Sequence, residues 1–474
     1  MTHKQNDAIE LIVNGAGGFR TRYDNYGYQD FRYIFLIGAG ASFSSDIPGG
    51  LQISESFMSE YNITEEMIEK EIAKDPNLSR YQAVLRIVQE GESAEHVSEH
   101  IRNFILKARR PEPDFRWKIN SCYNGIASII VNRKYFSRVA FTTNFDPLLH
   151  YAFIQNFYSE PVLIRHSQEI ENNSFPKGIE KDFPVLMYLH GYWQNHHLFH
   201  DATQFQNFHD TWIKLLTKEW NSNHVIVLGY SGLENSIATK WLKNCLSQPS
   251  DIKVWWCYYC ANEMLSNDDQ NKMEKIRSNL NCYDQRLEFI LIKSADQFIL
   301  DLGSRLDIEY CKNISCVNKI FDWFYPSDIS KFNNGATIRY YPGTDYLKID
   351  FESGNDLLPG NNHAGLNIDT VKHVLDINHY NEIELDYEIR FEGEIPKDSP
   401  GFEFKLHSEN SGWSYHIPIQ VDKRTKQLID LNEFRKKDIN FLKNIWRLVI
   451  ACDVKTMGIN NKLSIMIYKC ERRS

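Results

Sequence analysis

The sequence predicts a Rossmann-like α/β domain, built on a doubly wound parallel sheet with a helical insertion, followed by an all-β sandwich or jelly-roll domain. Up to about residue 305, short apolar runs alternate with helical patterns, which is the order of a parallel sheet covered by helices on both faces. From about Phe321 onward, the segments alternate apolar and polar residues instead. The chain has 474 residues, about three times the length of a typical domain, so it has room for both parts.

The α/β part is expected to span residues 1–305. Six apolar runs are predicted to be its buried parallel strands, because both faces of such strands lie under helices. They are Tyr33–Ile37, Ser137–Thr142, Val185–Leu189, Val225–Leu228, Val254–Tyr259 and Leu287–Ile292. Two sets of apolar residues fall at helix spacing between them: Val97, Ile101, Phe104 and Ile105, and Trp212, Leu215, Leu216 and Trp220. Residues 55–130 are predicted to be mostly helical and to interrupt the strand–helix order as an insertion.

The all-β part is expected to span residues 320–474, with the connection between about 305 and 325. Its predicted strands alternate apolar and polar residues, as in a sheet with one face on a core and one in water. They are Thr337–Tyr341, Tyr346–Phe351, Glu382–Phe391, Phe402–Leu406, Ser414–Val421 and Leu463–Tyr468. Clusters of Pro, Gly, Asn and Asp separate several of these strands, which favours tight turns.

Composition and charge exclude several classes of protein. The formal net charge of −9 argues against a dominant nucleic-acid-binding surface. Nine cysteines without regular spacing are typical of reduced thiols in a cytoplasm, and we expect a cytoplasmic location. The N-terminal residues MTHKQNDAIELIVNG show no signal-peptide pattern, and no run approaches the roughly 18 apolar residues of a membrane span.

A glycine-rich turn, GAGAS at residues 38–42, follows the first predicted strand directly. Glycines at the carboxyl end of a strand let backbone N–H groups approach a phosphate. A dinucleotide-binding fingerprint would carry a third glycine at position 43, where Phe43 stands, and the chain contains no P-loop motif. Taken alone, the turn is also compatible with a tight strand–helix connection that binds nothing.

Polar segments follow three other predicted strands, at the edge where open α/β sheets bind ligands. They are TTNFD at residues 142–146, LHG at residues 189–191 and GYSG at residues 229–232. A fourth polar segment, KSAD at residues 293–296, follows the last predicted strand of this part. The sequence therefore predicts one ligand site built from several strand ends.

In this order the segments resemble the sirtuin family of NAD-consuming domains, over about residues 30–305. That family carries G-A-G-x-S followed by I-P, then T-x-N-x-D, H-G and G-x-S, and the chain matches each motif. Two departures are informative. Gly49-Gly50-Leu51 stands where protein deacetylases of the family have Asp-Phe-Arg after the I-P pair. No cysteine lies between His190 and Gly229, where those enzymes carry a zinc ribbon. The chain is therefore similar to the divergent bacterial branch, whose members hydrolyse NAD in antiphage defence.

The resemblance implies that NAD is the substrate and assigns roles to particular side chains. His190 would be the general base, because a histidine can take a proton from water or from a ribose hydroxyl near neutral pH. Asn144 would orient a ribose hydroxyl and the water, and Asp146 would hold the carboxamide or stabilise the developing cation. The remaining predicted contacts to NAD are Gly38, Ala39, Gly40, Ser42, Ile47, Pro48, Thr142, Gly229, Ser231 and Asp296.

No metal is expected in this site. Cys257 and Cys260 lie within one predicted strand, where side chains alternate between faces, and are interpreted as core residues. Among the histidines at 196, 197, 200 and 209, only His196 and His200 have the i, i+4 spacing of a helical pair. The segment after Gly191 is interpreted as a turn, a short strand and a helix instead of a metal site. The basic run 435–437 is interpreted as a solvated face. The aromatic residues between 23 and 33 are compatible with a lid over the nucleotide, a subunit contact or plain packing.

Two alternative functions stay open from the sequence. One is an NAD-dependent protein deacylase or ADP-ribosyltransferase, which would share the NAD site but need a groove for an acceptor protein. The other is a non-catalytic sensor of NAD or ADP-ribose. In either case the C-terminal domain is expected to mediate assembly, as a homo-oligomer or with a partner. The resemblance implies a two-gene defence system whose second chain is, among others, a HerA-type hexameric ATPase or a short Argonaute. The all-β domain after the α/β domain favours the HerA-type partner, without a membrane or direct nucleic-acid role.

Overall fold

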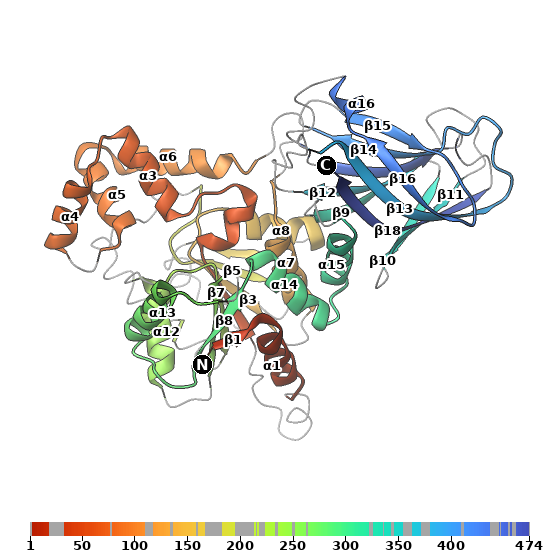
Figure 1. The fold of residues 1–474 in the computed structure, drawn as a ribbon. Coiled ribbons are helices and arrows are strands. Elements are labelled where there is room, and N and C mark those ends of the chain that lie inside the picture. The colour runs from red at the N-terminus through yellow and green to blue at the C-terminus, as the bar shows by residue number, and fades with distance from the viewer. Residues whose placement is uncertain are drawn as a thin grey trace. The chain divides into compact units, whose positions relative to one another are not determined.

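The chain divides into two compact units, Met1–Ile308 and Glu309–Ser474, which are described separately here (Figure 1). The computed structural model describes residues 2–18, 33–75, 78–109, 117–132, 136–157, 160–165, 183–194, 213–214, 216–217, 223–232, 236–248, 252–261, 264–321, 326–334, 336–342, 346–353, 363–370, 380–408, 412–436, 445, 447–453, 456 and 461–473. Within these residues, no helix has the length and apolar character needed to cross a membrane.

The first unit is built on a parallel sheet of eight strands in the order β1-β8-β7-β6-β2-β3-β5-β4. The strands are β1 (Thr2–Lys4), β2 (Tyr33–Ile37), β3 (Phe136–Thr142), β4 (Val162–Ile164), β5 (Val185–Tyr188), β6 (His224–Leu228), β7 (Val254–Tyr259) and β8 (Leu287–Ile292). β2, β3, β5 and β8 are buried along their whole length, as their apolar sequences require. The predicted Rossmann-like parallel sheet is confirmed.

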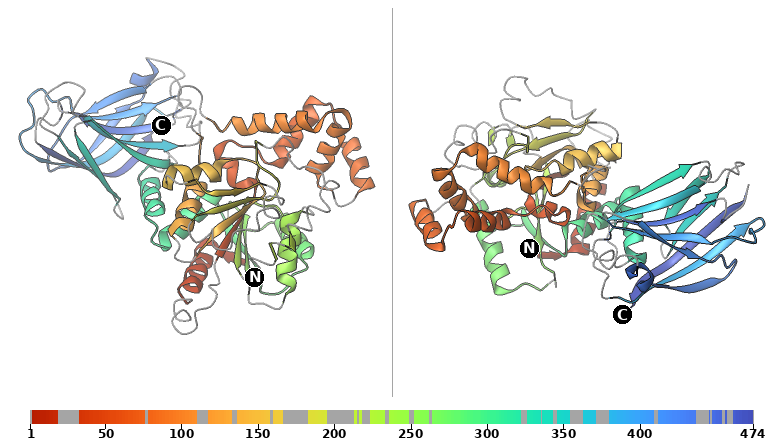
Figure 2. Two further views of the ribbon diagram at one scale, coloured as in Figure 1. Left: turned by 180° about the vertical axis from the view of Figure 1, so that it is seen from behind. Right: turned by 90° about the horizontal axis from the view of Figure 1, so that it is seen from above.

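Helices cover both faces of this sheet (Figure 2). One face packs against α12 (Ile237–Ser247) and α13 (Asn267–Leu280), whose apolar residues share a core with alternate residues of the strands. On the other side, α14 (Ala295–Arg305) packs against both α1 (Gln5–Gly18) and α7 (Ser121–Asn132); α7 contacts β3, and α1 and α14 contact β8. The helix α8 (Leu148–Phe157) packs against α7.

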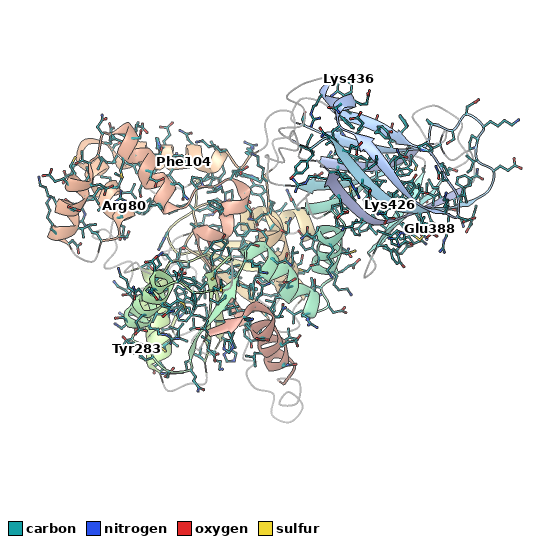
Figure 3. The ribbon with its side chains drawn as sticks, viewed as in Figure 1. Arg80, Phe104, Tyr283, Glu388, Lys426 and Lys436 are labelled. Atoms are coloured by element: carbon teal, nitrogen blue, oxygen red, sulfur yellow. The ribbon has the colours of Figure 1, made fainter. Side chains whose placement is uncertain are left out.

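The predicted insertion contains four helices, α3 (Gly50–Glu60), α4 (Glu65–Lys74), α5 (Arg80–Gly91) and α6 (Ala94–Leu106). Thr64, Ser79 and Ser93 cap the last three of these by accepting a backbone N–H with the side chain. Arg80 at the start of α5, labelled in Figure 3, pairs with Glu65 at the start of α4 at 2.5 Å. The range expected for the insertion, 55–130, is too long at its end, because α7 packs against β3 and α14 and belongs to the sheet layers.

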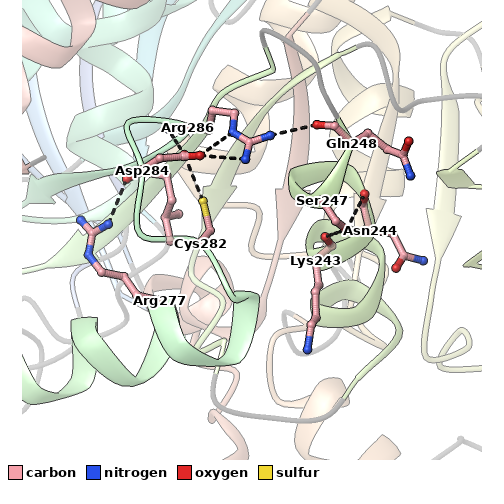
Figure 4. A network of polar contacts seen from close by, with 9 residues as sticks. Lys243, Asn244, Ser247, Gln248, Arg277, Cys282, Asp284 and Arg286 are labelled. Atoms are coloured by element: carbon pink, nitrogen blue, oxygen red, sulfur yellow. Dashed lines mark hydrogen bonds and ion pairs between the residues drawn. The ribbon is translucent and has the colours of Figure 1, made fainter.

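The opposite end of the sheet from the predicted site is held by a polar network (Figure 4). Arg286, just before β8, donates from Nε to Asp284 at 2.9 Å and from Nη1 to the Gln248 carbonyl at 2.9 Å. Cys282 donates from Sγ to the same Asp284 carboxylate at 3.4 Å. The contacts join the end of α12 to the segment that enters β8.

The second unit consists of two antiparallel sheets, β10-β11-β18-β13-β16 and β15-β14-β17-β12-β9, which confirms the predicted all-β character. Its elements are α15 (Glu309–Ile320), β9 (Pro326–Asn334), β10 (Thr337–Pro342), β11 (Leu347–Glu352), β12 (His363–Thr370), β13 (Glu382–Glu392), β14 (Phe402–His407), β15 (Gly412–Ile417), β16 (Arg424–Asp430), α16 (Asn432–Arg435), β17 (Arg447–Asp453) and β18 (Lys462–Arg473). Both sheets contribute to one apolar core. The segment expected to connect the domains forms α15, and Val317 and Ile320 of that helix are part of this core.

The edge strand β16 carries charged residues that pair with the neighbouring strand β13. Arg424 donates to both carboxylate oxygens of Asp386, at 2.8 and 2.9 Å, and Lys426 donates to Glu384 at 3.0 Å. Glu388 of β13 and Lys426 are labelled in Figure 3. Charged side chains on an edge strand generally oppose the addition of a further strand.

Candidate functional site

Four strand ends meet at the carboxyl edge of the parallel sheet, because β6, β2, β3 and β5 are neighbours in it. Backbone hydrogen bonds continue past these strands: the Gly38 N–H bonds to the Leu228 carbonyl at 2.8 Å and the Leu189 N–H to the Thr142 carbonyl at 2.8 Å. The strand order reverses between β2 and β6, and open α/β sheets bind ligands at such a switch point. The structure thus places four of the five predicted segments at neighbouring strand ends, and the fifth, after β8, reaches the glycine turn through Asp296.

The backbone of the glycine turn packs directly against the backbone of the segment that follows β6. The Gly40 N–H donates to the Gly229 carbonyl at 2.8 Å. A Cβ on Gly38 would lie 2.6 Å from that carbonyl oxygen, and one on Gly229 would lie 2.3 Å from the Ala41 nitrogen. Gly229 also has a φ of 69°, which other residues adopt with strain. The N–H groups of Gly38 and Gly40 are bonded within the protein, so any phosphate contact of this turn requires other groups.

We therefore expect Gly229→Ala to lower the stability of the first unit strongly. A positive φ at a residue with a Cβ costs about 1–3 kcal/mol, and the overlap with the Ala41 backbone adds to that. Thermal unfolding followed by circular dichroism measures the effect. The matched control is Gly91→Ala at the end of α5, where nothing lies within 4 Å of the added Cβ. Equal melting temperatures for the two variants would contradict the prediction.

The glycine turn continues into a short 3-10 helix, η2 (Ala39–Ser45), with one buried and one exposed side. Ala41, Ser42 and Ser45 are buried, whereas Ala39, Gly40 and Phe43 are exposed. Phe43, the residue that replaces the third glycine of the fingerprint, is 64% exposed.

Asp296 joins η2 to the first turn of α7. Its Oδ2 accepts from Ser44 at 2.7 Å, and its Oδ1 accepts from Ser121 Oγ at 3.0 Å and from the Cys122 N–H at 2.8 Å. Asn120 makes a second connection, donating to the Ala41 carbonyl at 2.7 Å and to Ser44 Oγ at 2.8 Å. Both oxygens of Asp296 thus bond to protein donors, so its contribution at this edge is to fix the turn.

Asn144 lies at the centre of the site and is 6% exposed. Its Nδ2 is within hydrogen-bonding distance of the Gly38 carbonyl at 3.2 Å, Ser42 Oγ at 2.9 Å and the Tyr123 hydroxyl at 2.8 Å. A carbonyl can only accept, so Gly38 determines which end of the amide points inward. The buried Oδ1 has no hydrogen-bond partner in the described part of the chain. A ligand hydroxyl or a water fits that oxygen, because an unpartnered buried acceptor is unfavourable.

Asp146 and Ser42 lie beneath Asn144 and are also buried. Ser42 Oγ donates to Asp146 Oδ2 at 2.7 Å, and the Leu148 N–H donates to Asp146 Oδ1 at 3.1 Å. Burial raises the pKa of Asp146 to about 6, against the opposing effect of these hydrogen bonds. The carboxylate thus contacts Ser42, and the Asn144 side chain is near enough to oppose the rise in its pKa as well.

Tyr123 and Asn120 are residues of the site that the sequence did not reveal. The Tyr123 hydroxyl lies 2.6 Å from Ser42 Oγ and is fully buried, and burial raises the pKa of Tyr123 well above its usual value. Both residues precede β3 by more than ten positions and belong to no motif. The signal that points to them is the cap of α7, in which Asn120 Oδ1 accepts the Tyr123 N–H at 3.0 Å.

His190 follows β5, on the neighbouring strand to Asn144. Burial lowers the pKa of His190 to about 4, and a hydrogen bond to the backbone of Thr143 opposes this only in part. The ring is therefore neutral at physiological pH, with one nitrogen donating to the backbone and the other able to accept. Gly191 follows with a φ of 93°, which turns the chain sharply after the histidine.

The other predicted residues occupy varied positions. Thr142 and Ile47 are buried, Pro48 is partly buried and Ser231 is exposed. Thr142 Oγ1 accepts the Asn144 N–H at 3.0 Å, which fixes the loop after β3. Cys257 and Cys260 are buried free thiols, and no cluster of three or more metal-ligating side chains occurs among the described residues. Outside the described part lie His196, His197, His200, His209, Trp212, Leu215, Trp220, Lys437 and residues 23–32.

Solved structures that match parts of this chain do so at low similarity. A loop-swap mutant of a Necallimastix patriciarum protein is 9% identical with a TM-score of 0.19, covering 30% of this chain and 89% of that one. The xyloglucanase domain of NopAA, a type three effector from Sinorhizobium fredii, is 9% identical with a TM-score of 0.19, covering 31% and 100%. These scores are too low to support a structural argument, and no curated protein matches the chain significantly.

One family model matches. Residues 138–280 are similar to the SIR2-like domain. The matched region contains Asn144, His190 and Gly229 but begins after the glycine turn at Gly38. The match supports the resemblance to sirtuin-like proteins and an NAD-related activity for the first unit.

Proposed function

We propose that the chain is an NAD glycohydrolase, which converts NAD⁺ and water into ADP-ribose and nicotinamide. The observation that carries this proposal is Asn144, whose amide nitrogen is held inward by three partners while its buried oxygen has none among the described residues. A neutral histidine lies at the end of the next strand. The match to the SIR2-like domain supports NAD as the molecule that is bound.

The chemistry requires little acid or base strength. The bond between C1′ of the ribose and the nicotinamide nitrogen breaks, and the electron pair leaves with nicotinamide, which becomes neutral. The ribose carbon then has oxocarbenium character, and water adds to it and loses a proton. Such a cationic carbon is a strong electrophile, so a weak base is enough to take the proton from the attacking water.

The two central side chains have complementary tasks in this scheme. Asn144 Oδ1 would accept a hydrogen bond from the ribose hydroxyl or the water and hold it in line. His190 would accept the proton, because its low pKa keeps the ring neutral at physiological pH. The close backbone packing of Gly38, Gly40 and Gly229 would hold the glycine turn in place at the edge of the sheet where the dinucleotide would bind.

The test is NAD consumption by the purified chain, with nicotinamide and ADP-ribose measured by mass spectrometry. We expect the wild type to release both products in equal amounts and His190→Ala to be slower by about 10²–10⁴-fold, the usual contribution of a general base. Release that depends on an added acyl-lysine peptide would instead identify a deacylase. Wild-type protein that leaves NAD intact, alone and with candidate partners, would refute the proposal.

We also propose that this activity serves bacterial antiphage defence and that the second unit mediates assembly, as a homo-oligomer or with a HerA-type hexameric ATPase. An unregulated NADase would kill its own cell, so a partner or an assembled state must control it. The resemblance to two-gene defence systems supports this proposal. Co-expression and co-purification with such an ATPase tests it, and a chain that stays monomeric and never associates would contradict it.

A further inference from the structure

We propose that Tyr123 is a positioning residue of this site. Its hydroxyl belongs to a chain of hydrogen bonds in which Asn144 donates to Tyr123, Tyr123 to Ser42 and Ser42 to Asp146. This chain keeps the Asn144 oxygen turned toward the substrate. The inference rests on the proposed hydrolase function. Tyr123 lies outside every motif and outside the region that matches the SIR2-like domain.

The direction of the chain follows from counting protons. An ionised Asp146 can only accept hydrogen bonds, so the Ser42 hydroxyl donates its single proton to Asp146 Oδ2 at 2.7 Å. Ser42 Oγ must then accept from the Tyr123 hydroxyl at 2.6 Å. Because the Tyr123 hydroxyl proton is already donated to Ser42, the Tyr123 oxygen accepts from Asn144 Nδ2 at 2.8 Å. Each donor thus determines the role of the next group.

The result of this order is a fixed orientation of the Asn144 amide. Nδ2 carries two protons, and the Tyr123 oxygen, Ser42 Oγ at 2.9 Å and the Gly38 carbonyl at 3.2 Å all lie near it as acceptors. The amide cannot rotate by half a turn without placing its oxygen against these acceptors, of which Tyr123 is the nearest. Oδ1 therefore stays on the other side, without a partner among the described residues.

The first turn of α7 is held so that Tyr123 arrives at this point. Asn120 accepts the Tyr123 N–H at 3.0 Å and also donates to the Ala41 carbonyl at 2.7 Å. Asp296 accepts the neighbouring Cys122 N–H at 2.8 Å. The helix start and the glycine turn are thus tied together around the hydroxyl, so their geometry does not depend on the Tyr123–Ser42 bond alone.

The experiment compares two substitutions that each remove only a buried hydroxyl. Tyr123→Phe breaks the chain, whereas Tyr188→Phe on β5 removes a buried hydroxyl that makes no hydrogen bond to Asn144, Ser42 or Asp146. We expect Tyr123→Phe to lower kcat by about 10- to 100-fold, because small misplacements of a positioning group have effects of that size. Its KM and melting temperature are expected to stay near those of Tyr188→Phe, which should itself remain close to the wild type.

A double substitution tests whether the links act together. If Ser42 and Tyr123 belong to one chain, the kcat of Ser42→Ala with Tyr123→Phe should be little lower than that of the worse single variant. An active wild type with equal kcat in Tyr123→Phe and Tyr188→Phe would overturn the positioning role alone. A double variant whose loss in kcat equals the product of the two single losses would also overturn the positioning role. A wild type that does not hydrolyse NAD would overturn the hydrolase proposal together with this inference.

Discussion

Asn144→Ala is expected to reduce kcat for NAD hydrolysis by about 10²–10³-fold, the size of effect seen when one precisely placed polar group is removed from an active site. The substitution removes the oxygen that is offered to the ribose hydroxyl or the water. It also removes the amide nitrogen that bonds Tyr123, Ser42 and Gly38. Steady-state release of ADP-ribose, followed by mass spectrometry, measures the loss.

Asn144→Asp separates shape from hydrogen bonding. The new carboxylate has nearly the same size but no hydrogen-bond donor. One of its oxygens would take the place of Nδ2, which lies 3.2 Å from the Gly38 carbonyl oxygen, and the two oxygens would repel each other. We expect a loss as large as that of Asn144→Ala. The control is Asn244→Ala on the exposed side of α12, which should hydrolyse NAD at the wild-type rate. If Asn144→Ala also retained that rate, Asn144 would have no role in catalysis.

The sequence predicted those parts of the fold in which local pattern and final burial agree. The buried strands β2 and β8 have the predicted bounds, because a continuous apolar run needs helices on both faces. β1 was missed, since its three residues THK carry no strand signal; they pair with β8, and His3 bonds the buried Glu288. β16 was missed because it is an edge strand with the mostly polar sequence RTKQLID.

The site divides in the same way. Its strand-end segments could be predicted, because parallel strands place their carboxyl ends at one edge and the polar residues follow them directly. What could not be predicted is the contribution of Tyr123 and Asn120, which reach Ser42, Ala41 and Asn144 from a helix far away in the sequence. Nor does a motif reveal that Ser42 and Asp296 bond to protein donors and acceptors at this edge. Tertiary packing alone determines these contacts.

The acid limb of the pH profile is expected to lie near pH 6 and to report Asp146. Burial raises the pKa of Asp146 to about 6 and lowers that of His190 to about 4, so Asp146 gains its proton first as the pH falls. A protonated Asp146 can donate to Ser42 instead of accepting from it, which reverses the chain and releases the Asn144 amide. We therefore expect kcat to fall about tenfold per pH unit below about pH 6. Measuring kcat between pH 4.5 and 8 tests this.

The same shift predicts opposite effects of Asp146→Asn on activity and on stability. The amide cannot ionise, and its NH₂ group donates to Ser42 at every pH, so kcat should be low throughout. Because the folded pKa of Asp146 lies above its unfolded value of 3.8, the stability linked to its proton is present below that value and is lost as the pH rises through about 6. At pH 7 we therefore expect the free energy of unfolding of Asp146→Asn to exceed that of the wild type by up to about 3 kcal/mol, so that the variant is the more stable protein. The difference should shrink toward pH 4, where the wild type is itself protonated. An acid limb near pH 4, with no gain in stability at pH 7, would assign the limb to His190 and remove Asp146 from the mechanism.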